Sequence, residues 1–140
     1  MQPVAPGTKR PRLLIADDAV ATRNGLAELM RRRGYRSLQA ANGSEAIELL
    51  KQESVDGLVL DLQMPGTDGF AVLDYVAEHR RGLPVVLLSG LAADEIQDRM
   101  ANLASPNLPP LFLKPVDADQ MLDVMELLLS GELPTDPSAV

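Results

Sequence analysis

Short apolar runs alternate with longer amphipathic stretches along most of this chain. Three of the runs are uniformly apolar and end at a polar residue, and they begin at Leu13, Leu58 and Val85. Runs of this length and character are typical of strands that are buried on both faces of a parallel sheet. The run 36–40 alternates polar and apolar residues, which predicts a half-exposed edge strand, and the short run 111–113 predicts a last strand.

The stretches between these runs have the spacing and the end signals of helices. The first begins at Ala19 and stops at Gly34, which favours a left-handed helix end. Asn42 and Asp117 are expected to cap the second and last helices, because their side chains can accept a hydrogen bond from a free amide there. The predicted apolar faces are Leu26, Leu29 and Met30 in the first helix, Phe70, Leu73 and Ala77 in the third, Ile96, Met100 and Leu103 in the fourth (about 92–103), and Met121, Met125 and Leu128 in the last.

Strands that alternate with helices imply right-handed crossovers and a parallel sheet covered on both faces. With the apolar strands in the centre and 36–40 at an edge, the expected fold class is α/β. We predict a single flavodoxin-like (βα)5 doubly wound parallel sheet with strand order 2-1-3-4-5. The domain is expected to span 12–130, with a flexible leader at 1–11 and a flexible tail at 131–140.

Composition narrows the possible functions. A length of 140 residues suits one domain with a full core, and a net charge of −7 argues against a nucleic-acid surface. The basic run Arg31–Arg33 falls in the last turn of the first predicted helix, where it would compensate the helix dipole. The lack of cysteine excludes disulfides and thiolate metal sites, and no apolar run has the length of a membrane span. We therefore expect a cytoplasmic protein without nucleic-acid or membrane partners.

Polar side chains follow four of the five predicted strands. Asp17 and Asp18 follow the first strand, Asp61 ends the third, Ser89 ends the fourth and Lys114 follows the fifth. Because the carboxyl ends of parallel strands lie along one edge of the sheet, these residues are expected to meet there. Each has a simpler interpretation when taken alone, as a helix cap, a solvated turn residue or a surface lysine. Their shared placement at strand ends favours a site.

The residue types indicate which chemistry such a site supports. Three carboxylates brought together repel one another, and a divalent cation would relieve that repulsion. A set of oxygen ligands without His or Cys suits Mg²⁺. If Asp61 attacks a phosphoryl group, its charge is replaced by roughly −1.5 to −2 on the phosphate. Mg²⁺ and Lys114 could hold that charge, and Ser89 could donate a hydrogen bond to it.

The same residues carry a resemblance to a known family. The resemblance covers about 12–130 and rests on Asp17–Asp18, the segment LDLQMPGTDG around Asp61, Ser89 and Lys114–Pro115. In these features the chain resembles the receiver domain of two-component response regulators. The resemblance implies that Asp61 accepts a phosphoryl group from a phosphohistidine of a sensor histidine kinase or a histidine phosphotransfer protein.

The resemblance also implies roles for the neighbouring residues. Mg²⁺ would be held by Asp18, Asp61 and the backbone carbonyl of Gln63, with Asp17 acting through water. The phosphoryl oxygens would be contacted by Lys114 and Ser89, and the peptide bond before Pro115 would be cis.

The sequence departs from the family near the last strand. Three residues before the lysine, where the family often has an aromatic ring, this chain has Leu111, and the segment Pro106–Pro110 replaces the usual Gly-Ala. We therefore expect a downstream protein partner to bind a differently shaped face made by the fourth helix, fifth strand and fifth helix. Gln63 and Leu91 lie where side chains can crowd the path of the hydrolytic water, and Leu91 is equally well explained as the first residue of a helix. His79 is expected to be a surface residue at a helix end.

Several functions remain open at this point. The chain is expected to be a stand-alone response regulator or the receiver of a hybrid histidine kinase. One alternative is a pseudo-receiver that binds partners without phosphorylation. A second is a Mg²⁺-dependent phosphatase with Asp61 as nucleophile, which we disfavour because the position of its usual second acid holds Gln63. The preferred prediction is a signalling domain rather than an enzyme.

Overall fold

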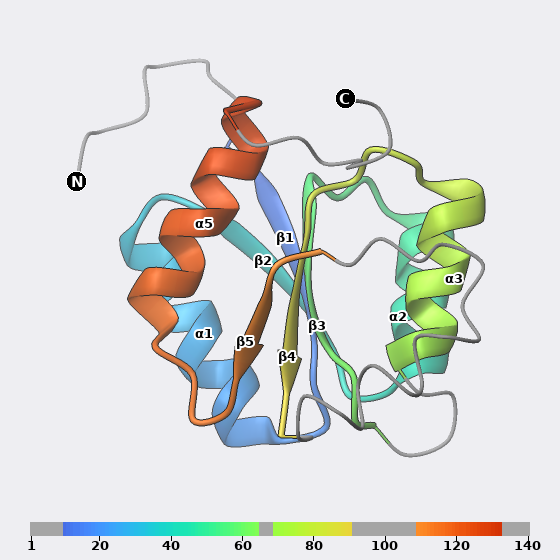
Figure 1. Cartoon of the computed structure of the whole chain (residues 1–140), viewed down its shortest axis with the longest axis horizontal. Coiled ribbons are helices and arrows are strands. Elements are labelled where there is room, and N and C mark those ends of the chain that lie inside the picture. Colours follow the sequence, from blue (N-terminus) through green and yellow to red (C-terminus); the bar gives the residue numbers. More distant parts are fainter. Residues whose placement is uncertain (1–9, 65–68, 91–108, 133–140) are drawn as a thin grey trace.

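The computed structural model describes residues 10–64, 69–90 and 109–132. These residues form a five-stranded parallel sheet, with α1 and α5 on one face and α2 and α3 on the other (Figure 1). The elements are β1 (Arg12–Ala16), α1 (Val20–Arg32), β2 (Arg36–Ala40), α2 (Gly43–Gln52), β3 (Gly57–Asp61), α3 (Gly69–His79), β4 (Val85–Ser89), β5 (Leu111–Leu113) and α5 (Ala118–Ser130).

The strand order β2-β1-β3-β4-β5 confirms the predicted flavodoxin-like sheet. Some predicted features lie outside the described residues. These are the fourth helix, Leu91, most of the segment 106–110, and most of the leader and tail.

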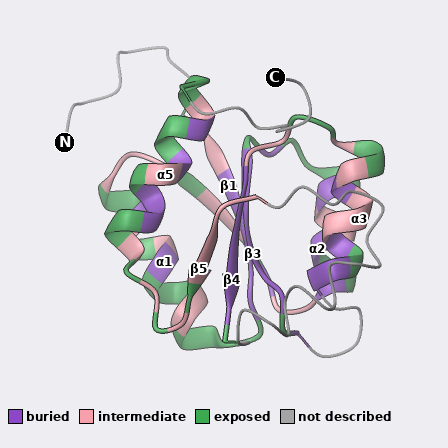
Figure 2. Ribbon diagram, viewed as in Figure 1, coloured by how far each residue is buried: buried purple, intermediate pink, exposed green. Residues whose placement is uncertain are grey.

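Burial follows the position of each strand in the sheet. Every residue of β3 and β4 is buried, whereas β2 and β5 at the two edges are partly exposed (Figure 2). Apart from their end residues, the central strands are apolar, as expected for strands whose two faces are both covered by helices. The prediction of central and edge strands from their apolar patterns is therefore confirmed.

Alternation along the strands divides the core into two layers. Leu58 and Leu60 of β3 pack under α2 and α3, while Val59 packs under α1 and α5. The residues predicted for the apolar face of α5 are all buried in the second layer: Met121, Met125 and Leu128.

The predicted apolar face of α3 is partly wrong. Val72 and Val76 are buried with Phe70, whereas Leu73 is only partly buried. The cause is Gly69, where an added Cβ would collide with the carbonyl oxygen of Asp61 and Cα of Leu62. This close approach to the end of β3 fixes the rotation of the helix and turns the residues three and seven positions after Gly69 inward.

The helix ends agree with their predicted signals. Asn42 Oδ1 accepts a hydrogen bond from the Glu45 amide at 2.9 Å, and Asp117 Oδ1 accepts one from the Gln120 amide at 3.1 Å. Gly34, just beyond α1, has a φ of 89°, which is the left-handed conformation expected there. The described part of the chain contains no helix that is both long and apolar enough to cross a membrane.

The three arginines at the end of α1, Arg31 to Arg33, make different contacts. Arg31 and Arg32 pair with Glu28 of the same helix, as suits residues of its last turn. Arg33 lies just past the helix and instead reaches α5, where its Nη2 is 2.6 Å from Asp123 Oδ1. Arg33, at the C-cap of α1, therefore also links α1 to α5, a contact that the sequence did not indicate.

Candidate functional site

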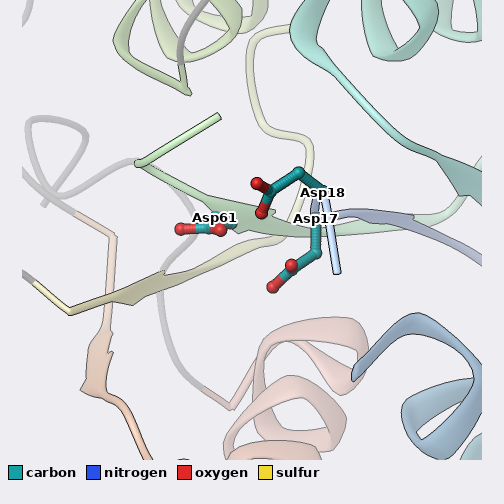
Figure 3. A group of neighbouring side chains, drawn as sticks. All are labelled: Asp17, Asp18 and Asp61. Atoms are coloured by element: carbon teal, nitrogen blue, oxygen red, sulfur yellow. The ribbon is translucent and has the colours of Figure 1, made fainter. Parts of the chain in front are cut away.

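The acids that follow the parallel strands meet at the carboxyl edge of the sheet. One carboxylate oxygen from each of Asp17, Asp18 and Asp61 lies within 4.8 Å of the other two (Figure 3). The side chains of Asp17 and Asp61 are 0% and 1% exposed, while Asp18 is exposed. The group therefore has two acids inside the protein and one at its surface.

Asp61 is held from both sides at the end of β3. Its Oδ1 accepts a hydrogen bond from the Gln63 amide at 2.9 Å, and its Oδ2 accepts one from Lys114 Nζ at 3.0 Å. The strand itself continues to pair beyond this point, because the amide of Leu62 donates to the carbonyl of Leu88. Strand pairing thus fixes where the Asp61 carboxylate emerges.

Asp17 is held by hydrogen bonds of both its backbone and its side chain. Its amide donates to the Ala40 carbonyl at 3.1 Å, and its Oδ1 accepts from the Ala19 amide at 2.9 Å. Its Oδ2 lies 3.1 Å from Lys114 Nζ, but the ammonium is not aligned for a hydrogen bond. Among the described residues, this buried oxygen has no hydrogen-bond partner.

Lys114 and Ser89 come to the same edge from neighbouring strands. The Lys114 amide donates to the Ser89 carbonyl at 2.8 Å, which continues the pairing of β4 with β5. Ser89 is buried, and the Lys114 side chain is 31% exposed with its ammonium among the acids. The peptide bond before Pro115 is cis. The structure thus brings together Asp17, Asp18, Asp61 and Lys114, with Ser89 at the same edge.

The electrostatics of this group leave negative charge uncompensated. Burial raises the pKa of Asp61, and the neighbouring Asp17 raises it further, despite the hydrogen bonds from Gln63 and Lys114. Burial alone would lower the pKa of Lys114, but its hydrogen bond to Asp61 and its ion pair with Asp17 outweigh burial and raise the pKa. The ammonium therefore stays charged, yet one cation does not balance three acids.

Two residues near the site make contacts that the sequence did not indicate. The Gln63 side chain accepts a hydrogen bond from the Gly90 amide at 2.9 Å and so joins the loops after β3 and β4. Arg23 Nη1 donates to the Asp17 carbonyl at 2.8 Å. The only signal for Arg23 was its position in the first turns of a helix that follows the acids, which does not by itself specify a backbone contact.

The acid group meets the requirements of a divalent cation. It offers carboxylate oxygens from three residues, it lacks a balancing charge, and Asp17 Oδ2 lacks a hydrogen-bond partner within the described residues. Mg²⁺ favours oxygen ligands of this kind and usually binds through one or two carboxylates. The residues present therefore fit this ion.

A sheet of this order, with acids and a lysine at its carboxyl edge, defines the class of receiver domains. The chain belongs to the response regulator receiver domain family, which it matches over residues 13–126. The resemblance drawn from the sequence is thereby confirmed. Proteins of this family are signalling domains that interact with histidine kinases or phosphotransfer proteins.

This chain spans different fractions of the relatives that it matches. It is 37% identical over 112 residues to the transcriptional activator protein PfeR of Pseudomonas aeruginosa, a match covering 77% of this chain and 36% of PfeR. It is 31% identical over 121 residues to the sporulation initiation phosphotransferase F of Bacillus subtilis, covering 84% of this chain and 93% of that protein. The chain thus spans about a third of PfeR and nearly all of the phosphotransferase.

Solved structures agree with this assignment. The signal receiver domain of a signal transduction histidine kinase from Syntrophus aciditrophicus is 25% identical, with a TM-score of 0.77, and the match covers 91% of this chain and 96% of that one. A CheY-like receiver domain protein from Methanospirillum hungatei has a TM-score of 0.79 at 22% identity, covering 89% and 97%. The second likeness supports the fold.

Proposed function

We propose that this receiver domain takes a phosphoryl group onto Asp61 and thereby switches the binding of a protein partner. The observation that carries the proposal is the Asp61 carboxylate itself. It is buried, its Oδ2 lies 3.0 Å from Lys114 Nζ, and two more acids lie close enough to share a cation. A buried carboxylate with a raised pKa and a charged neighbour is typical of a functional site.

In the proposed reaction, one carboxylate oxygen of Asp61 attacks the phosphorus of a phosphohistidine. A P–O bond forms as the P–N bond breaks, and the electron pair of that bond returns to the imidazole nitrogen. Lys114 remains positioned to neutralise the transferred phosphoryl oxygens, and Ser89 donates its hydroxyl hydrogen to one of them. Buried surroundings strengthen these contacts, because the effective dielectric there is low.

Mg²⁺ is the proposed cofactor. When bound, it supplies positive charge that offsets the acids and the incoming phosphoryl group. Asp18, Asp61 and the backbone carbonyl of Gln63 would hold it, with Asp17 acting through water. The backbone at Gln63 is already fixed by its hydrogen bond to Asp61 Oδ1, which supports this ligand set.

The proposed partners follow from the family. The phosphodonor would be a sensor histidine kinase or a histidine phosphotransfer protein, and the domain would span 12–130. A downstream protein would bind the face that includes β5 and α5, whose fourth-helix part lies outside the described residues. The relatives include a receiver of a histidine kinase and a phosphotransferase of similar length, which supports both a hybrid-kinase receiver and a stand-alone regulator. We propose a cytoplasmic signalling domain, not an enzyme, without nucleic-acid or membrane partners.

An intact-mass measurement tests the proposal. Protein incubated with Mg²⁺ and a small acyl phosphate should gain the mass of one phosphoryl group, and Asp61→Asn should gain none. Asp123→Asn is the matched control, because Asp123 is an exposed acid on α5 and should not affect uptake. An unmodified wild type would favour the pseudo-receiver, and uptake by Asp61→Asn would place the acceptor elsewhere. Sustained release of phosphate from a phosphate ester would favour the phosphatase.

A further inference from the structure

The start of α1 is tied to the site in an unusual way. Its N-cap residue is Ala19, which offers no side-chain hydrogen bond, and its first turn carries no acid. Instead, the Asp17 side chain accepts a hydrogen bond from the Ala19 amide. The loop that carries Asp17 and Asp18 therefore needs other contacts to fix its path into the helix.

Arg23 supplies such a contact from one turn inside α1. Its Nη1 donates to the backbone carbonyl of Asp17 at 2.8 Å, and its Nε donates to Gln39 Oε1 at 3.0 Å. Gln39 lies on β2 opposite Ile15 of β1, and its Nε2 donates to Asn24 Oδ1 at 3.3 Å. One guanidinium thus joins the acid loop to both α1 and β2.

The contact acts on the peptide unit between the two acids. The Asp17 amide and side chain are already hydrogen bonded, to the Ala40 carbonyl and the Ala19 amide. With its carbonyl also held by Arg23, the plane of the next peptide bond cannot rotate without breaking a hydrogen bond. That plane sets the direction in which the Asp18 side chain points from the backbone. Asp18 itself is exposed, so packing does little to orient it.

We infer that Arg23 is a positioning residue that holds the Asp17–Asp18 peptide in the orientation needed to bind a divalent cation. The inference rests on the proposed Mg²⁺ site. Groups that orient metal ligands without touching the metal contribute measurably to metal affinity.

Charge and geometry predict opposite effects at this position. Arg23 brings positive charge toward the acids, so its charge alone opposes the arrival of Mg²⁺. Removing that charge would strengthen binding if charge were its main contribution. If Arg23 acts by positioning, a variant that keeps the charge but loses the paired hydrogen bonds should bind Mg²⁺ more weakly.

Arg23→Lys is that variant. A lysine keeps the charge, but its single ammonium lacks the fixed fork that lets Arg23 reach both Asp17 and Gln39. We expect Mg²⁺ titration of metal-free protein by calorimetry to give an affinity about 10-fold weaker than wild type. Arg36→Lys is the matched control, because the Arg36 guanidinium likewise donates two hydrogen bonds, both to the Arg10 carbonyl, at the opposite ends of the strands. It should leave the affinity unchanged.

Gln39→Met provides a second and milder test. It removes the acceptor that holds Arg23 Nε but leaves Arg23 and its charge in place, and it should also weaken Mg²⁺ binding. The double variant Arg23→Lys/Gln39→Met should be no weaker than Arg23→Lys alone, because both changes remove one network. Urea unfolding in EDTA shows that each variant is folded, and if Arg23→Lys does not fold, Gln39→Met decides.

The outcomes separate this inference from the proposed function. A wild type that binds no Mg²⁺ would overturn the site and the role of Arg23 together. Wild-type binding with an unchanged or tighter affinity in folded Arg23→Lys or Gln39→Met would overturn the positioning role alone. The amide signal of Asp18 offers a metal-free readout, and it should shift in Arg23→Lys and stay in place in Arg36→Lys.

Discussion

Two ionic groups in this molecule each contain three carboxylates and one cation. The edge cluster consists of Asp17, Asp18, Asp61 and Lys114. The helix cluster, between the end of α1 and α5, consists of Arg33, Asp119, Asp123 and Glu126. Their formal charges are the same, and their ion-pair distances are similar, with shortest contacts of 3.0 Å and 2.6 Å.

Burial distinguishes the two clusters. Asp17 and Asp61 have side chains that are at most 1% exposed, whereas the least exposed acid of the helix cluster, Glu126, is 45% exposed. Water compensates the excess charge of the helix cluster, so its net effect on stability is small. The edge cluster lacks that compensation. Burial, rather than the number of acids, is therefore what distinguishes the sheet edge and fits it to a cation.

Removing the cation of each cluster should give the largest difference in stability between the two clusters. Lys114→Met leaves Asp17 and Asp61 buried without a positive partner, and we expect the free energy of unfolding in EDTA to fall by about 3 kcal/mol. Arg33→Met leaves acids that water solvates, and it should cost about 1 kcal/mol or less. Urea unfolding measures both. Mg²⁺ should recover part of the loss in Lys114→Met and none in Arg33→Met, and equal losses would contradict the comparison.

Neutralising one acid in each cluster should change the stability of the protein in opposite directions. Because burial makes the Asp61 charge unfavourable, Asp61→Asn should stabilise the metal-free protein at pH 7 by about 1 kcal/mol. Asp123→Asn removes a solvated partner of Arg33 and should destabilise it by about 0.5 kcal/mol. Thermal or urea unfolding in EDTA checks the signs, and a destabilised Asp61→Asn would show that Lys114 already compensates the charge.

The stabilisation by Asp61→Asn should depend on pH. The pKa of Asp61 is higher in the folded than in the unfolded protein, so protonation favours the folded state. Relative to Asp61→Asn, wild type should therefore gain stability as pH falls through the raised pKa toward the ordinary value of 3.8. It should lose that gain as pH rises again. Unfolding of both proteins in EDTA between about pH 4 and 7 measures the difference, and a pH-independent difference would exclude a raised pKa.

A change of salt concentration should have the smallest effect on the stability difference between the clusters. At about 1 M NaCl, screening acts within a few ångströms and weakens exposed ion pairs more than buried ones. The loss of stability in Arg33→Met should therefore shrink by about a few tenths of a kcal/mol, while that in Lys114→Met changes less. Repeating the urea series at two salt concentrations gives this comparison, and equal salt dependence would place both clusters in similar solvent.

Much of the fold could be predicted because local patterns and burial agree. The central strands are apolar apart from their end residues, and Asn42, Gly34 and Asp117 mark helix ends by their own chemistry. The meeting of the acids with Lys114 followed from topology, since parallel strands bring their carboxyl ends to one edge.

The features that could not be predicted depend on contacts between distant segments. In α3, Leu73 and Val72 are both apolar, and the choice between them is made by the contact of Gly69 with the end of β3. The role of Arg33 depends on where α5 lies. The hydrogen bond from Arg23 to the Asp17 carbonyl uses a backbone acceptor that every residue has. No pattern of side chains in the sequence could therefore predict it.

Calorimetric titration of metal-free protein with Mg²⁺ tests most directly whether the edge cluster is a cation site. We expect one Mg²⁺ per chain in wild type and in Asp123→Asn, and binding that is lost or at least about 10-fold weaker in Asp61→Asn. Equal binding by wild type and Asp61→Asn, or no binding by any of the three, would contradict the assignment of the buried acids to the metal and phosphoryl site.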